Sequence, residues 1–446
     1  MIKNQRTLNL YYRKNLVGKL SSSPSSVEFY FSYSKKWQLN GFSLSPKLPL
    51  SGNFTNLDVT YFFQNLLPEG DNLATISQWL NISKTEKFEV LRKIGSDLSG
   101  AFILSDENKI FNTQHADRQL THQELSERLA VREQIPFSVW DQKIRVSSAG
   151  FQDKIGIKVI NSKWFLPDGI DNHTSHILKP APVNKPFESM VVNEFFCMKL
   201  SEQIKLPTAK TSLHLIPEPI LLIERFDRIL EKNGFYSKIH VIDGCQLLGL
   251  PENHKAERPY GSGSDVAHIR EGASVAKLIK AIKAYSSTPI VDLKLFLNWL
   301  AFQLCIGNVD AHAKNISFFV DNVGKIKLAP FYDQICILDF EQLDQVNQPF
   351  TSLDIDLSMA IGDEFSLLKI GAYDIALMAQ ESEIPIKAVT SSFQKIAQTT
   401  LEELNNVKIN DYYQRRMYIK RIITKLSLHL LKITSHAEQA YKDLQI

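Results

Sequence analysis

The sequence predicts an α+β protein with two lobes, in which a small N-terminal α/β domain precedes a sheet-rich lobe and a mainly helical C-terminal lobe. Short apolar and alternating runs occupy residues 7–33 and return from about Arg145, whereas helical patterns dominate the second half. The chain has 446 residues, more than the roughly 250–300 that one hydrophobic core usually serves. Two or three domains are therefore expected.

Composition is that of a folded protein without a membrane span. Hydrophobic residues make up 44% and charged residues 22% of the chain, and no stretch approaches the roughly 20 apolar residues of a transmembrane helix. The N-terminus lacks the apolar segment of a signal peptide, so a cytoplasmic location is expected. A net charge of +3 predicts no strong general affinity for nucleic acid. The four cysteines form no CxxC pair and are expected to be core thiols.

Local patterns indicate the elements of the first part of the chain. The runs "LNLYY", "LVGKL" and "VEFYF" predict an antiparallel meander. The stretch "NLDVTYFFQNLLPEG" has apolar residues at helical spacing and stops at Pro68 and Gly70, which predicts a helix. Thr121 and Glu124 have the spacing of a capping box, so a second helix should start there.

The second part begins with strands. "IGIKVI", "KWFLP" and "SHILK" are followed by a helix from about Glu188 to Ile204 and by the strand "ILLIERF", after which long helical patterns continue. A small sheet with one helix, joined by a linking strand to a helical body, is the layout of a two-lobed nucleotide-binding enzyme. Its linking strand would offer backbone groups to an adenine, although layout alone does not establish function.

Polar side chains gather in "GNVDAHAKNISFF". Asp310 and Asn315 have the D-x4-N spacing of a kinase catalytic loop, in which the aspartate faces the acceptor hydroxyl and the asparagine binds metal. Asp333, which ends "LAPFYD", lies where a second magnesium ligand belongs. Lys179 ends a strand and could place its ammonium group on phosphates, with Glu194 on the next helix as its partner. These residue types are those that phosphoryl transfer needs.

Each signal alone has a simpler explanation. A D-x4-N match arises by chance in many chains, Asp333 could be a turn residue or helix cap, and His312 would usually be structural. Lys179 would ordinarily be a solvated strand end, and "SSAGFQDK" a hairpin turn. Their order favours the catalytic interpretation, because a loop, a lysine, a linking strand, the D-x4-N loop and an aspartate follow one another as a kinase requires.

Several segments belong together: "VSSAGFQDKIGIKV", "HILKP", "NEFFCMKLSEQIKLPTA", "LLIERFDR", "CQLLGLP", "GNVDAHAKNISFF" and "LAPFYD". They resemble the successive motifs of the HipA family of bacterial serine/threonine kinase toxins. The segments "VGKL", "FFQNLLPEG" and "IGSDLSGAFIL" are similar to the small N-terminal domain of that family. The resemblance covers nearly the whole chain.

The resemblance implies a fold related to protein and phosphoinositide kinases that binds ATP and Mg²⁺. It also implies a small helix-turn-helix antitoxin partner, HipB, which binds operator DNA. Asp310 would be the catalytic aspartate, and Asn315 and Asp333 the magnesium ligands. The implied ATP site comprises the lysine Lys179, the hinge residues Glu224 and Phe226, and His312 and Tyr332 beside the nucleotide. It also includes residues of the phosphate loop: Ala149, Gly150, Phe151, Gln152 and Lys154.

Family members also phosphorylate a serine in their own phosphate loop and so switch themselves off. Ser147 falls on that position, and Ser148 beside it leaves open which hydroxyl is used. A phosphate adds about −1.5 to −2 charges, which would compete with ATP for the backbone donors of the loop. The family points to a protein substrate, possibly an aminoacyl-tRNA synthetase, with glutamyl-tRNA synthetase first.

The expected boundaries are an N-terminal domain over residues 1–105, a kinase N-lobe over 106–230 and a helical C-lobe over 231–446. Two alternatives stay open: a small-molecule kinase on the same fold, and a non-catalytic ATP-binding corepressor. The basic segment 412–432 is expected to be a core helix with a solvated basic face, the alternative being a contact with DNA or an acidic partner.

Overall fold

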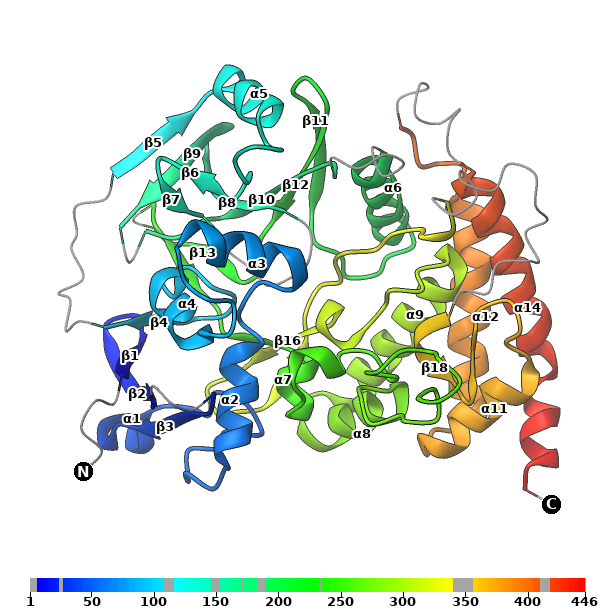
Figure 1. The fold of residues 1–446 in the computed structure, drawn as a ribbon. Coiled ribbons are helices and arrows are strands. Elements are labelled where there is room, and N and C mark those ends of the chain that lie inside the picture. Colours follow the sequence, from blue (N-terminus) through cyan, green and yellow to red (C-terminus); the bar gives the residue numbers. More distant parts are fainter. Residues whose placement is uncertain are drawn as a thin grey trace. The chain divides into compact units, whose positions relative to one another are not determined.

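The computed structural model describes residues 6–23, 27–106, 116–145, 153–169, 172–182, 189–232, 234–339, 356–409 and 418–445. The chain divides into two compact units. Unit 1 comprises Met1–Val183, Ser212–Ile242 and Phe319–Lys325, and unit 2 comprises Asn184–Thr211, Asp243–Phe318 and Ile326–Ile446. Unit 1 is rich in strands and unit 2 is mainly helical, which confirms the predicted α+β class (Figure 1). The expected domain boundaries at residues 105 and 230 stay predictions.

Unit 1 begins with the predicted antiparallel meander. Its strands run in the order β3-β2-β1-β4, with β1 at Arg6–Tyr12, β2 at Asn15–Ser22, β3 at Phe29–Tyr33 and β4 at Phe102–Ser105. Leu8 and Leu10 alternate inward from β1 and are buried, as one covered sheet face requires. Four helices accompany this sheet: α1 Lys35–Asn40, α2 Asn56–Gln64, α3 Gly70–Trp79 and α4 Lys87–Ile94. Phe88 of α4 packs edge-on against Phe29, with ring centroids 5.6 Å apart.

The second sheet of unit 1 has six strands in the order β11-β12-β10-β8-β9-β5. The predicted strands are β8 Ile155–Ile160, β9 Lys163–Asp168, β10 His176–Pro180 and β12 Pro219–Glu224, while β5 Ala116–Leu120 and β11 Thr211–Leu215 are additional. Helix α5, His122–Ala130, starts with the predicted capping box, because Thr121 and Glu124 exchange side-chain and backbone hydrogen bonds. Two hairpins complete the unit: β6 Val139–Trp140 with β7 Lys143–Ile144, and β13 Arg228–Leu230 with β14 Tyr236–Lys238.

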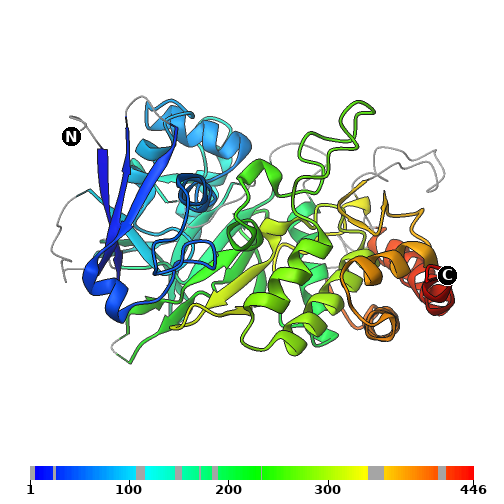
Figure 2. The same cartoon turned by 90° about the horizontal axis from the view of Figure 1, so that it is seen from below.

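Unit 2 is built around α9, Pro289–Ile306. By length and composition α9 could cross a membrane, but 61% of it is buried inside the protein, as in a core helix. Trp299 of α9 stacks between Phe296 and Phe331 at centroid distances of 5.7 and 6.0 Å. Helix α12 packs against α9 and α14, and α12 and α14 are drawn in orange and red in Figure 2. The α-helices in the described part of unit 2 are α6 Met190–Gln203, α7 Gly244–Leu248, α8 Val275–Tyr285, α9, α11 Ala372–Glu381, α12 Ile386–Glu403 and α14 Ile419–Asp443.

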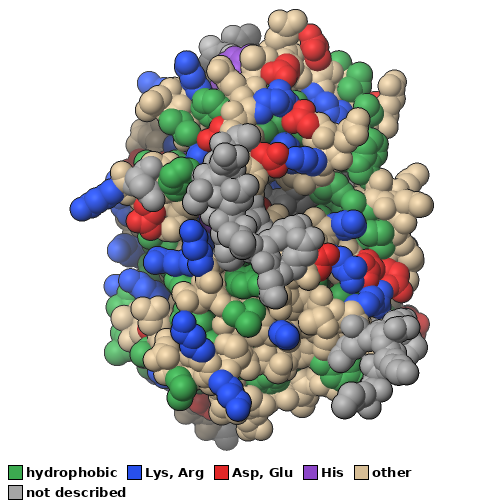
Figure 3. Space-filling view, turned by 90° about the vertical axis from the view of Figure 1, so that its left-hand side faces the viewer, with side chains coloured by type: hydrophobic (Ala, Val, Ile, Leu, Met, Phe, Trp, Pro, Cys, Tyr) green, Lys and Arg blue, Asp and Glu red, His purple; other side chains and the backbone are tan. Residues whose placement is uncertain are grey.

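Short strands connect these helices: β15 Val241–Asp243, β16 Ser317–Val320, β17 Ile326–Leu328, β18 Asp356–Ile361 and β19 Glu364–Ser366. All four cysteines are buried free thiols, as predicted. On α14 the exposed Arg421 and Lys425 lie opposite a buried apolar stripe, which favours the core helix with a solvated basic face. Lys and Arg side chains are likewise spread over the face shown in Figure 3, in keeping with the low net charge.

Candidate functional site

The D-x4-N loop starts where α9 ends. Gly307 adopts a left-handed conformation with φ of +68°, and its backbone N–H donates to carbonyls of the last turn of the helix. Such a C-terminal glycine stops a helix and turns the chain sharply. The following residues then lead into the short 3₁₀ helix Ala313–Asn315 and into β16. A tight loop is therefore fixed between a buried helix and a strand.

Asp310 and Asn315 close this loop. The amide nitrogen of Asn315 donates to the backbone carbonyl of Asp310 at 3.0 Å, and the backbone N–H of His312 donates to the same carbonyl at 2.8 Å. The side chain of Asp310 is 66% exposed, whereas His312 and Asn315 are buried. The loop thus presents a carboxylate outward on a rigid base, and the oxygen of the Asn315 amide is the atom that could bind a cation.

Lys314 anchors the loop to the start of α7. Its buried ammonium group lies 2.9 Å from the carboxylate of Asp243, which also caps α7 by accepting from the backbone N–H of Gln246. Gly244 follows directly, and a Cβ atom at that position would lie 2.6 Å from the carbonyl oxygen of Ala313. The close approach of α7 to the loop therefore requires glycine.

A chain of buried amides joins the loop to the segment of Asp333. Asn308 donates to the side-chain oxygen of Gln303 at 2.8 Å and to the backbone carbonyl of Asp333 at 3.4 Å. Gln303 donates to Gln334 at 3.3 Å, and Gln334 donates to Ser201 at 3.1 Å. Because buried polar groups are costly unless they are bonded, this network fixes the two segments relative to each other.

Asp333 itself has a left-handed backbone with φ of +55°, a conformation that is uncommon for residues other than glycine. The preceding Phe331 is held on both sides, since its N–H donates to Pro207 and its carbonyl accepts from Ala209. Between them, the hydroxyl of Tyr332 donates to the carbonyl of Lys314 at 2.8 Å and lies 2.8 Å from the hydroxyl of Ser317. Burial raises the pKa of this phenol, which therefore stays protonated.

The donor atoms of Asn315 and Asp333 are an amide oxygen and a carboxylate, which are hard ligands suited to Mg²⁺. Among the described residues no group of three or more His, Cys, Asp and Glu side chains could hold a metal ion alone. This sparse set fits magnesium, which commonly keeps water and substrate phosphates as its other ligands. It does not fit a structural zinc site.

Three predicted nucleotide residues lie on unit 1. Lys179 is buried on β10 and pairs in register with Leu221 of β12. Glu224, at the exposed end of β12, pairs with His176, and Phe226 contacts Phe319 edge-on at 5.9 Å. Lys179 and Glu224 thus lie on two neighbouring inner strands of one sheet, and Phe226 lies in the segment that follows β12.

The predicted phosphate loop lies mostly outside the described residues. This applies to Ser147, Ser148, Ala149, Gly150, Phe151 and Gln152. Its flanks are described: the N–H of Gly156 donates to the carbonyl of Arg145 at 3.1 Å, and the carboxylate of Asp153 accepts from Phe137 at 2.7 Å. Lys154 lies directly before β8 and is partly buried. Both ends of the predicted loop are thus anchored in unit 1.

The two units divide the predicted site residues. Unit 2 brings together the loop of Asp310, His312 and Asn315 with the segment of Tyr332 and Asp333, through the contacts above. Unit 1 carries the predicted lysine and hinge, and Glu194, the expected partner of Lys179, belongs to α6 of unit 2.

Two family models match the chain: the HipA N-terminal domain over residues 8–105 and the HipA-like C-terminal domain over residues 146–407. The chain belongs to the HipA family. It is 32% identical over 393 residues to the serine/threonine-protein kinase toxin HipA of Shewanella oneidensis, covering 88% of this chain and 87% of that protein. It is also similar to a solved Shewanella oneidensis complex of HipA, HipB and operator DNA, with a TM-score of 0.81, 27% identity and coverage of 98% and 99%.

The motifs of this HipA-family chain did not indicate several residues that hold the Asp310 loop in place. Asn308 and Lys314 stand inside the quoted "GNVDAHAKN" segment, and their polar character was the available signal. Asp243, Gln303 and Gln334 gave no local signal, because their partners lie far away in the sequence.

Replacing Gly244 by alanine should displace the Asp310 loop. The added Cβ would lie 2.6 Å from the carbonyl of Ala313, and forcing an atom into such a packed site typically costs about 1–3 kcal/mol. Gly371→Ala is the matched control in the same unit, because a Cβ there meets only ordinary contacts. Urea unfolding compares the two variants, and an equal stability loss in both would contradict the close-packing argument.

Proposed function

We propose that this chain is a HipA-type protein serine/threonine kinase that transfers the γ-phosphate of ATP with Mg²⁺. The observation that carries the proposal is the buried amide chain through Asn308, which joins the loop of Asp310 to the segment of Asp333. A phosphotransferase needs a carboxylate for the acceptor hydroxyl and oxygen ligands for magnesium in fixed relation. Family membership supports the same assignment.

In this proposal Asp310 accepts the proton of the attacking hydroxyl, because its carboxylate is the exposed one on a buried loop. Asn315 and Asp333 would hold magnesium, which neutralises charge on the phosphates when bound. His312 and Tyr332 of unit 2 would line the nucleotide. Lys179, with Lys154 and the loop of residues 147–152, would bind the phosphates, while Glu224 and Phe226 would receive the adenine.

The leading hypothesis is that the substrate is a protein, and the family makes glutamyl-tRNA synthetase the first candidate. Incubation of the chain with labelled ATP, Mg²⁺ and a cell lysate tests this reading, with the Asp310→Asn chain as the blank. Label on one polypeptide supports a protein kinase, and label only on metabolites supports the small-molecule alternative. If no phosphate is transferred to any acceptor, including the chain itself, the result supports the non-catalytic corepressor alternative.

A HipB-like helix-turn-helix protein is the proposed partner. The similar solved structure contains HipB and operator DNA besides HipA, and the match extends over 98% of this chain. Contact with the operator would then be made through the partner, in keeping with the low net charge of the chain itself.

Asp333→Ala should weaken ATP binding only when magnesium is present, since the change removes a metal ligand and not a nucleotide contact. Calorimetric titration with ATP, with and without Mg²⁺, measures the effect. Equal ATP affinity of the unchanged chain under both conditions would contradict a metal role for Asp333.

Purified protein should carry one phosphate on Ser147 or Ser148, more often on Ser147. Charge added to the phosphate loop would then reduce ATP affinity, because the loop no longer presents its N–H donors to the nucleotide. Intact masses of the unchanged chain, Ser147→Ala and the double alanine variant decide the site. A phosphate that persists in the double variant would remove these serines from the proposed switch.

A further inference from the structure

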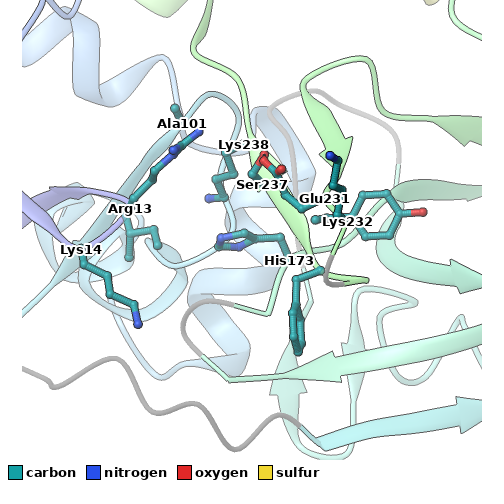
Figure 4. Close-up of a pocket in the computed structure, with 11 residues that line it drawn as sticks. Arg13, Lys14, Ala101, His173, Glu231, Lys232, Ser237 and Lys238 are labelled. Carbon is teal, nitrogen blue, oxygen red and sulfur yellow. The ribbon is translucent and has the colours of Figure 1, made fainter.

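Unit 1 contains a cavity of about 580 Å³, and the described residues that line it include none of the proposed kinase residues. Its walls come from the turn between β1 and β2, the residues before β10, and the hairpin β13–β14. In Figure 4, Lys238 and His173 lie in the middle of the view, with Arg13 on one side and Lys232 on the other. Its volume is in the range of pockets that hold small ligands.

Four basic residues are part of the cavity lining. Arg13, Lys14, Lys232 and Lys238 line the cavity, and Glu231 is the one carboxylate among the described residues of the lining. That carboxylate already accepts a hydrogen bond of 2.6 Å from Ser237. Concave walls with one sign of charge concentrate ions of the opposite sign. The cavity should therefore attract anions.

Lys238 of the lining belongs to a cluster of buried charged side chains. Arg225 and Arg228 are fully enclosed around Asp227, at distances of 2.9 and 2.6 Å. Arg228 also lies 3.0 Å from Asp97, and Lys238 lies 3.9 Å from the same carboxylate. When Lys238 is protonated, three cations share two carboxylates. A further negative charge beside Lys238 would balance the cluster.

Lys238 is the member of the cluster that also lines the cavity. Its ammonium group donates to the carbonyls of Ser96 and Phe102, at 3.1 and 3.4 Å. Burial, together with the nearby Arg228, lowers the pKa of Lys238 to about 7. His173 beside it is held neutral, because burial and the charge of Lys238 lower the pKa of its imidazole. An ammonium group under such repulsion gains from an anionic partner.

Two aromatic residues, Phe235 and Tyr236, also line the cavity. Phe235 is 39% exposed, and the ammonium group of Lys158 lies 5.5 Å from its ring centre. Tyr236 is fixed by a hydrogen bond of 3.3 Å from its hydroxyl to the carbonyl of Val159. A lining that holds both basic and aromatic side chains suits a molecule that carries a phosphate and a flat ring.

We propose that this cavity binds a small phosphorylated ligand of nucleotide size, with its phosphate against Arg13, His173 and Lys238. The site is separate from the proposed ATP residues of unit 1, because Lys179, Glu224 and Phe226 do not line it. It joins the N-terminal sheet to the β13–β14 hairpin within unit 1, so a bound ligand would stabilise that junction.

Calorimetric titration of the full chain tests the site with inorganic pyrophosphate, cytidine 5′-monophosphate and cytidine. A non-hydrolysable ATP analogue with Mg²⁺ is kept saturating to occupy the kinase site. Pyrophosphate and the monophosphate are expected to bind and cytidine to bind far more weakly, since the phosphate supplies the charge. Arg13→Glu with Lys14→Glu should weaken both anions by at least about tenfold.

Lys35→Glu with Lys36→Glu is the matched control, because both residues are exposed on α1, outside the cavity lining, and the charge change is the same. This control should leave binding unchanged. Absence of pyrophosphate and monophosphate binding at millimolar concentration would overturn the proposal. So would binding that the ATP analogue abolishes, or binding that both double variants weaken equally.

Discussion

Replacing Asp310 by asparagine is expected to lower phosphoryl transfer by about 10³-fold and to leave ATP affinity unchanged. The side chain of Asp310 is 66% exposed, so it is available to an acceptor hydroxyl. The hydrogen bonds that shape the loop use the backbone carbonyl of Asp310, which accepts from His312 and Asn315. Asparagine keeps that carbonyl and removes only the proton acceptor. The loss can therefore be assigned to the carboxylate.

Single-turnover transfer and calorimetric ATP affinity measure the two quantities separately. Asp265→Asn serves as the control, since Asp265 is an exposed aspartate of the same unit. Near-normal transfer by the Asp310→Asn chain would refute the catalytic assignment. A parallel loss of ATP affinity would instead indicate that Asp310 acts on the nucleotide or on the fold.

The sequence predicted those helices and strands whose formation depends mainly on neighbouring residues. The capping box of Thr121 and Glu124, the strands β8, β9, β10 and β12, and helix α6 all appear within a few residues of their expected positions. The strands β5, β13 and β14 did not stand out, because they are only three to five residues long, and β5 also pairs with β9, which lies more than forty residues further along the chain. Short strands have little periodicity to detect.

In the candidate site, too, a local motif indicates some residues, whereas contacts between distant positions involve others. The D-x4-N spacing drew attention to Asp310 and Asn315, since the shape of this loop is set locally, and their catalytic roles stay predictions. The hydrogen bond from Asn308 to the carbonyl of Asp333 and the ion pair of Lys314 with Asp243 join positions far apart in the chain. One sequence holds no signal for such pairs. The residues that position the proposed catalytic groups could therefore be recognised only in the folded structure.

Asp227→Asn is expected to destabilise unit 1 by about 3–5 kcal/mol, because it leaves two buried guanidinium groups without their shared partner. Asp227 accepts hydrogen bonds from Arg225 and Arg228 and from the backbone N–H of Gly100, at 2.9, 2.6 and 3.3 Å. The residue directly follows the proposed hinge at Phe226 and reaches the N-terminal part of unit 1 through Gly100. One carboxylate thus fixes the linking strand to the preceding domain.

Asp168→Asn is the matched control, because Asp168 pairs with Lys143 on the surface, where both side chains are more than half exposed. That change should cost about 0–1 kcal/mol. Urea unfolding gives both values, and hydrogen exchange of the amides of β10 and β12 locates the loss in unit 1. Equal losses in the two variants would show that the buried cluster contributes no more than a surface pair.

The pH dependence supplies an independent test of the same carboxylate. Burial alone would raise the pKa of Asp227, but Arg225 and Arg228 reverse this and lower it below the usual value. A lowered pKa means that the ionised form stabilises the fold above the unfolded pKa of about 3.9, and that this contribution is lost as the pH falls toward the folded value. The stability difference between the unchanged chain and Asp227→Asn should therefore be constant near neutral pH and shrink below about pH 4. A difference that grows on acidification would contradict the ionised pairing.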